Sequence, residues 1–323
     1  MPHSGEDDLI ARFFAPLAGQ GGLGLKDDAA LLSVEPGFEL VVTCDALVAG
    51  VHFFAEDPPD AIAQKALRVN LSDLAAKGAC PKGFVLALAL PRALKVDGWL
   101  AAFAEGLGTD IAAYKCPLLG GDTVMTPGPL MVSVTAFGAV PVGRMVPRTG
   151  ARPGDLLYVT GTVGDAALGL QVRLGALPGE GADHLLARYL RPQPRNVLAS
   201  VLRDHASAAM DVSDGLIGDL AKMMRVSGVS AEIELACVPV SAQASAVIAA
   251  HPGALETALT GGDDYEILAC VPPRNAAAFE GCAALAGMAV TRIGHVMKGQ
   301  AAPRVRDASG AIMAFGRVSY SHF

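Results

Sequence analysis

One segment constrains this chain more than any other: an apolar run that ends in two glycines, a carboxylate and a hydroxyl, at Leu118 to Thr123. Glycines let a backbone turn tightly and approach a ligand closely. A carboxylate on such a backbone suits a hard cation such as Mg²⁺. Turns favour Gly and Asp on their own account, so an ordinary turn and a ligand-binding turn both explain this segment alone.

The same design recurs along the chain. Aspartates stand at the ends of apolar segments or within apolar surroundings at Asp27, Asp28, Asp45, Asp73, Asp211, Asp214, Asp263 and Asp264. A single acid/base pair needs two carboxylates, whereas several converging aspartates describe a cage for two or more hard cations. We therefore predict one multi-metal phosphate site centred on Asp122.

Asp73 illustrates the choice between a structural and a functional role. It lies in a helix predicted from Asp60 to Lys77, on the face that carries Ala66 and Val69. A buried carboxylate needs a partner. A salt bridge to Lys77, four residues further on, and a metal ion inside the fold both satisfy that need.

Composition excludes several classes of function. The net charge of −7 and the lack of a basic stretch argue against nucleic-acid binding. The six cysteines form no C-x-x-C pair, which argues against a zinc site. The N-terminus is polar and acidic, unlike a signal peptide, and the apolar runs are broken before the length of a membrane span. We expect a cytoplasmic chain without membrane contact.

The order of turns and apolar segments predicts two domains. The densest turn cluster runs from Pro147 to Asp155, so we place the boundary there, between domains 1–150 and 151–323. Strands and helices alternate without a regular βαβ repeat, which predicts α+β layers in each half. In the first half we expect a helix at Val96–Tyr114 and a strand from Leu130 to Val140, with the Gly-Gly-Asp turn before that strand.

The sequence lacks the common motifs of phosphate-transferring enzymes. There is no G-x-x-x-x-G-K-[ST] loop and no protein-kinase motif set. Arg144 and Arg148 are candidates to neutralise phosphoryl oxygens. His52 lies seven residues after Asp45, and both a structural imidazole and a substrate contact explain it. Hydroxyls stand beside motif acids at Thr43, Thr123 and Ser213.

Taken together, these motifs resemble the thiamine-monophosphate kinases, whose superfamily includes aminoimidazole ribonucleotide synthetase and selenophosphate synthetase. The resemblance is carried by Asp27–Ala30, Thr43–Phe53, Val69–Gly78, Leu119–Thr123, Asp211–Leu216, Gly262–Glu266 and Tyr320–Phe323. It implies Mg²⁺-dependent, direct in-line phosphorylation of thiamine monophosphate by ATP, giving thiamine diphosphate. It also implies a homodimer in which the N-terminal sheets pair, with a C-terminal α/β domain on each side.

The resemblance also implies roles for individual residues. Metal-binding positions are Asp28, Thr43, Cys44, Asp45, Asp73, Asp122, Asp211 and Asp214. Nucleotide-binding positions are Tyr114, Gly121, Asp122, Arg148 and Ser213. Substrate positions are His52, Asp263 and a residue near the C-terminus, for which Arg317 and Tyr320 are the candidates. No protein nucleophile is implied.

Four positions depart from the family pattern. Lys26 replaces a glycine, Cys44 a hydroxyl residue, Asp263 a glutamate, and Arg317 an aromatic ring. Two alternatives therefore stay open: another ATP-using member of the superfamily, similar to selenophosphate synthetase or to hydrogenase-maturation enzymes, and a non-catalytic protein that binds nucleotide or thiamine phosphate. Enzymes similar to selenophosphate synthetase typically carry a reactive cysteine or selenocysteine near the N-terminus with a neighbouring lysine. The first cysteine here, Cys44, lies inside a metal motif, which argues against that one alternative.

Overall fold

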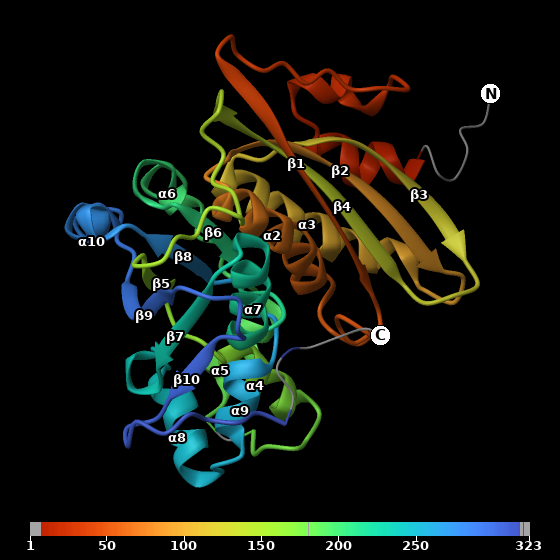
Figure 1. The fold of residues 1–323 in the computed structure, drawn as a ribbon. Coiled ribbons are helices and arrows are strands. Elements are labelled where there is room, and N and C mark those ends of the chain that lie inside the picture. The colour runs from red at the N-terminus through yellow and green to blue at the C-terminus, as the bar shows by residue number, and fades with distance from the viewer. Residues whose placement is uncertain (1–7, 180, 317–318, 320–323) are drawn as a thin grey trace. The chain divides into compact units, whose positions relative to one another are not determined.

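The computed structural model describes residues 8–179, 181–316 and 319 (Figure 1). The chain divides into two compact units. Unit 1 comprises the residues up to Leu74 together with Ala79–Gly143, and unit 2 comprises Ala75–Gly78 together with the residues from Arg144 onward. Ala75 and Ala76 count with unit 2 because their side chains belong to one of its buried apolar clusters.

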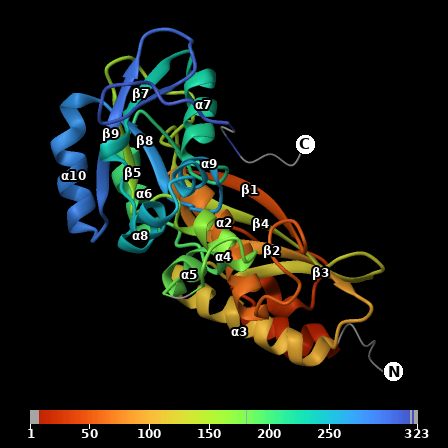
Figure 2. The same ribbon diagram turned by 90° about the horizontal axis from the view of Figure 1, so that it is seen from below.

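Unit 1 is a mixed sheet with two long helices on one face (Figures 1 and 2). Its elements are β1 (Phe38–Val48), α2 (Pro59–Ala76), β2 (Cys80–Pro91), α3 (Val96–Tyr114), β3 (Leu118–Thr126) and β4 (Met131–Pro141), preceded by helical turns at Ile10–Phe14, Ala15–Leu17 and Gln20–Leu25. The strand order is β1-β4-β2-β3. β4 runs antiparallel to β1 and to β2, and β2 runs parallel to β3.

Residue alternation in β1 decides which side chains face the helices. Val41 and Leu47 are buried, whereas Val42 is 57% exposed. Successive side chains of a strand point to opposite faces. Thr43 and Asp45 therefore share the covered face with Val41 and Leu47.

The helix at Val96–Tyr114 is confirmed, but the turn expected at Gly-Gly-Asp is wrong. Gly120, Gly121 and Asp122 lie inside β3, where they pair with residues 85–87 of β2. A Cβ atom on Gly121 would lie 1.9 Å from the carbonyl oxygen of Leu86. A close approach of two strands, not a tight turn, is what requires glycine at this position.

Unit 2 is built on a second sheet of mixed direction. Its elements are β5 (Leu156–Thr160), α4 (Asp165–Arg173), α5 (Asp183–Leu190), α6 (Ala199–His205), β6 (Ala208–Asp211), α7 (Leu216–Ser227), β7 (Ser230–Glu234), α8 (Ala242–Ala250), α9 (Ala254–Thr260), β8 (Ile267–Val271), α10 (Ala276–Leu285), β9 (Val290–Met297) and β10 (Arg304–Arg306), with short 3₁₀ turns at Asn196–Leu198, Leu235–Cys237 and Pro273–Asn275. The strand order is β10-β7-β9-β5-β8-β6.

Apolar side chains cover both faces of this sheet. Leu157 and Val159 of β5 pack in the cluster that includes α7, whereas Tyr158 packs in the cluster that includes α6 and α10. Figure 2 shows α7 and α10 on opposite sides of the strands. The predicted α+β architecture of helices layered on mixed sheets is confirmed.

No helix among the described residues has both the length and the apolar character needed to cross a membrane. The six cysteines are free thiols. Burial raises the pKa of the Cys116 thiol to about 12 and also raises that of Cys270. These two thiols are packing residues, since the reactive form of cysteine is the thiolate.

The close pairing of β2 and β3 gives a stability prediction. Gly121→Ala should lower the free energy of unfolding by about 2 kcal/mol or more, because the new methyl group must push the Leu86 carbonyl away. Gly120→Ala is the matched control, since a Cβ atom there meets nothing within 4 Å. Urea unfolding of the full chain measures both. Equal stability of the two variants would contradict this account of the pairing.

Candidate functional site

A cavity of about 440 Å³ in unit 1 brings together two groups of predicted site residues. Its lining includes Asp27 and Asp28 from one segment and Gly121 and Asp122 from β3. The first segment is tied to β3, since the amide of Gly19 donates to the Leu118 carbonyl at 2.8 Å. This volume is in the usual range for ligand pockets.

Asp73 faces β1. Its carboxylate accepts a hydrogen bond of 2.5 Å from the hydroxyl of Thr43. The structural alternative, a salt bridge to Lys77, is not what holds this carboxylate, because Lys77 donates instead to the carbonyl of Ala209 at 2.7 Å. Asp45 lies two residues after Thr43 on the same face of β1. Thr43, Asp45 and Asp73 thus present oxygen atoms on the covered side of the sheet.

Cys44 points to the other face of the sheet. Its side chain is exposed, and its sulfur accepts a hydrogen bond of 3.2 Å from the hydroxyl of Thr135. Adjacent residues of a strand face opposite ways, so the thiol and the Thr43 hydroxyl cannot serve one ligand. At Cys44, only the backbone carbonyl is left as a candidate ligand.

The carboxylates do not form a ready-made metal cage. Among the residues that the structure describes, no three His, Cys, Asp or Glu side chains are grouped closely enough to hold a metal ion. Mg²⁺ commonly binds through one or two carboxylates, several waters and the phosphates of a substrate. The pair Asp28 and Asp122 in one cavity fits a Mg²⁺ ion that arrives with a polyphosphate.

His52 lies in the loop between β1 and α2. The Val48 amide donates to its Nδ1 atom at 3.0 Å, so in the neutral ring the hydrogen is on Nε2. Lys65 holds the same loop by donating to the His52 carbonyl at 3.0 Å. The imidazole is thus oriented by its own loop.

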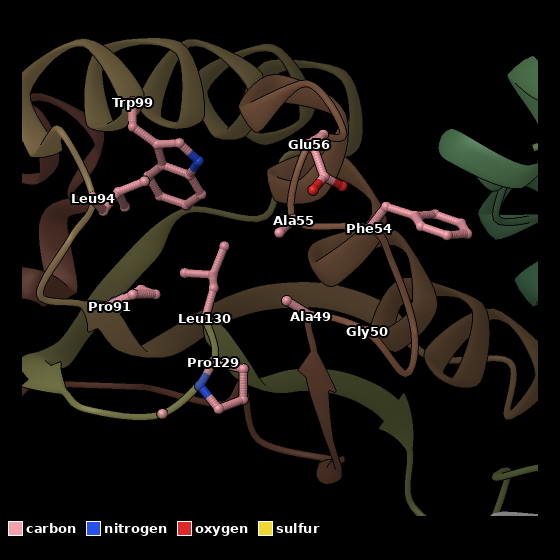
Figure 3. Close-up of a pocket in the computed structure, with 11 residues that line it drawn as sticks. Ala49, Gly50, Phe54, Ala55, Glu56, Pro91, Leu94, Trp99, Pro129 and Leu130 are labelled. Carbon is pink, nitrogen blue, oxygen red and sulfur yellow. The ribbon is translucent and has the colours of Figure 1, made fainter.

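The loop after β1 also lines a second cavity of unit 1, of about 410 Å³ (Figure 3). Its wall is largely apolar, with Trp99, Leu94 and Leu130 around it, and Glu56 is the one charged residue among those that line it. A single carboxylate offers fewer oxygen ligands for a phosphate-bound cation than Asp27, Asp28 and Asp122 in the first cavity. The phosphate chemistry predicted from the sequence therefore fits the aspartate-lined cavity better than this one.

The predicted nucleotide residues outside β3 are not among the residues that line the cavity of Asp28 and Asp122. Tyr114 ends α3, and the Arg68 guanidinium lies 5.8 Å from the centroid of its ring. Arg148 is exposed. Arg144, the other arginine considered for phosphate, forms an exposed ion pair with Asp204 at 2.7 Å.

In unit 2, the loop between β6 and α7 carries three of the predicted residues. Asp211 is 5% exposed at the end of β6. The amides of Ser213 and Asp214 both donate to the carboxylate of Asp219, at 2.9 and 2.8 Å. Lys222 of α7 bonds the carboxylates of Asp214 and Asp219. Lys222 was not predicted as a site residue, although its spacing of three from Asp219 on a helix is a recognisable signal.

Beside this loop runs the segment that contains Asp263. The Asp263 amide donates to the Ser213 carbonyl at 2.9 Å, and the Tyr265 amide donates to the Val212 carbonyl at 2.8 Å. Asp263 and Tyr265 both have left-handed backbones, with φ of 73° and 52°. Such a conformation costs a non-glycine residue on the order of 1–2 kcal/mol. Surrounding contacts must therefore fix this segment.

Those contacts come from two buried acids. Glu266 is completely buried and binds Arg188 at 2.7 Å, Arg195 at 2.7 Å and the Thr160 hydroxyl at 2.5 Å. Asp264 is also completely buried, and both of its carboxylate oxygens accept from the Gly164 amide. Burial raises the pKa of Asp264 well above its ordinary value. Sequence reasoning missed the two arginines, which lie more than 70 residues away in the chain.

Comparison with known proteins supports the resemblance. The family "AIR synthase related protein, N-terminal domain" matches residues 26–140, and the corresponding C-terminal domain matches residues 152–305. A thiamine-monophosphate kinase from Caulobacter vibrioides is 46% identical over 301 residues, which are 91% of this chain and 85% of the relative. The chain belongs to the thiamine-monophosphate kinase family.

Two solved structures of this family agree with the fold. The thiamine-monophosphate kinase of Stenotrophomonas maltophilia is 38% identical with a TM-score of 0.82, over 94% of this chain and 96% of that one. AaThiL complexed with AMPPCP and TMP is 30% identical with a TM-score of 0.78, over 98% and 94%. The resemblance drawn from the motifs is therefore confirmed for family and fold. The roles of single residues stay predictions, and Arg317 and Tyr320 lie outside the described residues.

The buried ion cluster of unit 2 yields a prediction for the family's Gly262–Glu266 motif. Glu266→Gln should lower the free energy of unfolding by about 3–5 kcal/mol, because the guanidinium groups of Arg188 and Arg195, whose side chains are only 5% and 12% exposed, lose their countercharge. The control is Asp204→Asn, which breaks the exposed pair with Arg144 and should cost less than about 1 kcal/mol. Urea unfolding at neutral pH compares them. Similar losses in both variants would show that the cluster does not anchor this segment.

Proposed function

We propose that this chain transfers the terminal phosphoryl group of ATP to thiamine monophosphate, giving ADP and thiamine diphosphate. The observation that carries the proposal is the cavity that Asp28 shares with Gly121 and Asp122, which lie more than 90 positions further along the chain. The family motifs had singled out all three residues. Relatives named for this activity match the chain over most of its length. The AMPPCP and TMP bound to AaThiL are an ATP analogue and the proposed acceptor.

Mg²⁺ is the metal that these acids would hold. Asp28 and Asp122 line the cavity, and Asp45 and Asp73 present further carboxylates with the Thr43 hydroxyl. Bound Mg²⁺ would neutralise charge on the phosphates. In unit 2 we assign the same chemistry to Asp211 and Asp214, where Lys222 now neutralises Asp214. A cation at Asp214 would take over the charge balance that Lys222 provides.

The protein's own part is to position two anions that repel each other. An oxygen of the acceptor phosphate attacks the terminal phosphorus in line, and the bond from that phosphorus to the leaving ADP oxygen breaks. Positioning can supply a large share of such a rate enhancement. No protein nucleophile takes part, and the pKa of about 12 for Cys116 is consistent with an inert thiol.

The remaining residues bind the ends of the two substrates. We assign Tyr114, Gly121, Arg148 and Ser213 to the nucleotide, following the family motifs. His52 and Asp263 are assigned to thiamine monophosphate, His52 through its Nε2 atom. The Asp263 carboxylate suits the thiamine moiety, which carries a positive charge, and a bridging water can make up for a side chain one carbon shorter than glutamate.

We also propose that the chain works as a cytoplasmic homodimer. The open face of the unit 1 sheet supports this, because Leu40 and Val42 of β1 are 42% and 57% exposed there. Apolar residues exposed together on one face are typical of protein interfaces. Free cysteines suit a reducing compartment. Light scattering at micromolar concentration should give twice the chain mass of 33.0 kDa, and a single-chain mass would contradict the dimer.

Incubation of the full chain with Mg-ATP and thiamine monophosphate tests the activity. Chromatography should show ADP and thiamine diphosphate in equal amounts, and none without Mg²⁺. Asp122→Asn should lower turnover by about a hundredfold or more, because one ligand of the cation is lost. Asp97→Asn, which removes an exposed partner of Arg12, is the control and should keep turnover.

Three other results would overturn this proposal. ADP without thiamine diphosphate would indicate another ATP-using member of the superfamily. Binding of both ligands without any turnover would indicate a non-catalytic protein. Equal turnover of wild type and Asp122→Asn would remove Asp122 from the site.

A further inference from the structure

Partly buried and fully buried residues alternate in the segment from Asp263 to Glu266, and the proposed reaction does not explain this alternation. Asp264 and Glu266 are completely buried. Asp263 precedes these two acids and Tyr265 lies between them. Both Asp263 and Tyr265 are only partly buried, and both have a left-handed backbone conformation. Glycine would adopt this conformation without strain. Unit 2 thus has two partly exposed residues with strained backbones at positions where glycine would be unstrained.

The contacts that fix this shape belong to the buried residues. Both carboxylate oxygens of Asp264 bind the amide of Gly164, and a side chain at Gly164 would collide with Ala258, 2.4 Å away. Glu266 is held by two arginines and a hydroxyl. The backbone is further tied to Val212 and Ser213. Tyr265 takes part in these contacts through its backbone amide, which donates to the Val212 carbonyl.

The two strained residues face each other. The Tyr265 hydroxyl donates to the Asp263 carboxylate at 3.4 Å, a long hydrogen bond that links the ring to the acid. An aromatic ring with a carboxylate nearby can receive an organic cation, which is attracted by the ring quadrupole and by the negative charge. A polyphosphate is repelled by the same carboxylate. Strained backbone that persists beside such groups is a mark of ligand-binding sites.

We propose that Tyr265 is a specificity-determining residue that receives the cationic thiazolium ring of thiamine monophosphate next to Asp263. Asp264 and Glu266 are positioning residues that hold Tyr265 in its left-handed conformation. This inference rests on the proposed function and adds to it a residue that selects the cationic part of the acceptor. The nucleotide does not use Tyr265.

Three variants of the full chain test the proposal in the Mg-ATP assay. Tyr265→Leu should raise the KM for thiamine monophosphate about tenfold, with the KM for ATP changed by less than about twofold. Tyr265→Phe keeps the ring and should raise the KM for thiamine monophosphate only about two- to threefold. Tyr265→Gly should raise it as Leu does while its Tm stays level or increases, because the backbone strain is relieved.

Lys115→Gly is the matched control for strain relief. Lys115 is another left-handed residue, with φ of 53° at the end of α3 in unit 1. It should gain stability with no change in the KM for thiamine monophosphate. A purely structural Tyr265 would behave in the same way: an unaltered acceptor KM in the Leu and Gly variants would overturn the inference and leave the proposed function intact. A wild-type chain without turnover would overturn the proposed function, and this inference with it.

Discussion

Repulsion between like-charged carboxylates is the constraint on which the site depends. Two of the acids assigned to a metal are held by a group that a cation could replace or join. Asp73 accepts from a neutral hydroxyl, and Asp214 pairs with Lys222. Asp28 and Asp122 line one cavity, and both residues are exposed to solvent. The fold therefore accommodates these four carboxylates without a metal ion.

Rigid supports keep these acids in place. In unit 1, Asp45 lies on β1, Asp73 on α2 and Asp122 on β3, and Gly121 lets β2 and β3 approach closely at Asp122. In unit 2 the support is itself charged, since Glu266 is buried between two arginines. A buried ion cluster contributes little net stability. It does define one geometry for the segment that presents Asp263 and Tyr265.

Local sequence patterns predicted what depends on local structure. The helix at Val96–Tyr114 was predicted to the residue, and the long helix before β2 within one residue at each end. The turn predicted at Gly-Gly-Asp was wrong. Glycine is required at position 121 because the carbonyl of Leu86, on the neighbouring strand, leaves no room for a side chain. Arg188 and Arg195 could not be predicted as partners of Glu266, because a single sequence does not show which distant charges meet. The family motifs named the acids that the proposed function uses, but they do not show the hydrogen-bond partners of these acids.

The most direct test of the central claim is the effect of Mg²⁺ on thermal stability. The melting temperature of the full chain is measured with and without Mg²⁺ in the presence of a non-hydrolysable ATP analogue, for wild type, Asp73→Asn and the surface control Asp97→Asn. A ligand that binds only the folded state raises the melting temperature. We expect a clear Mg²⁺-dependent rise in melting temperature for wild type and Asp97→Asn and a much smaller one for Asp73→Asn. An equal rise in all three would contradict the claim that these carboxylates hold the cation.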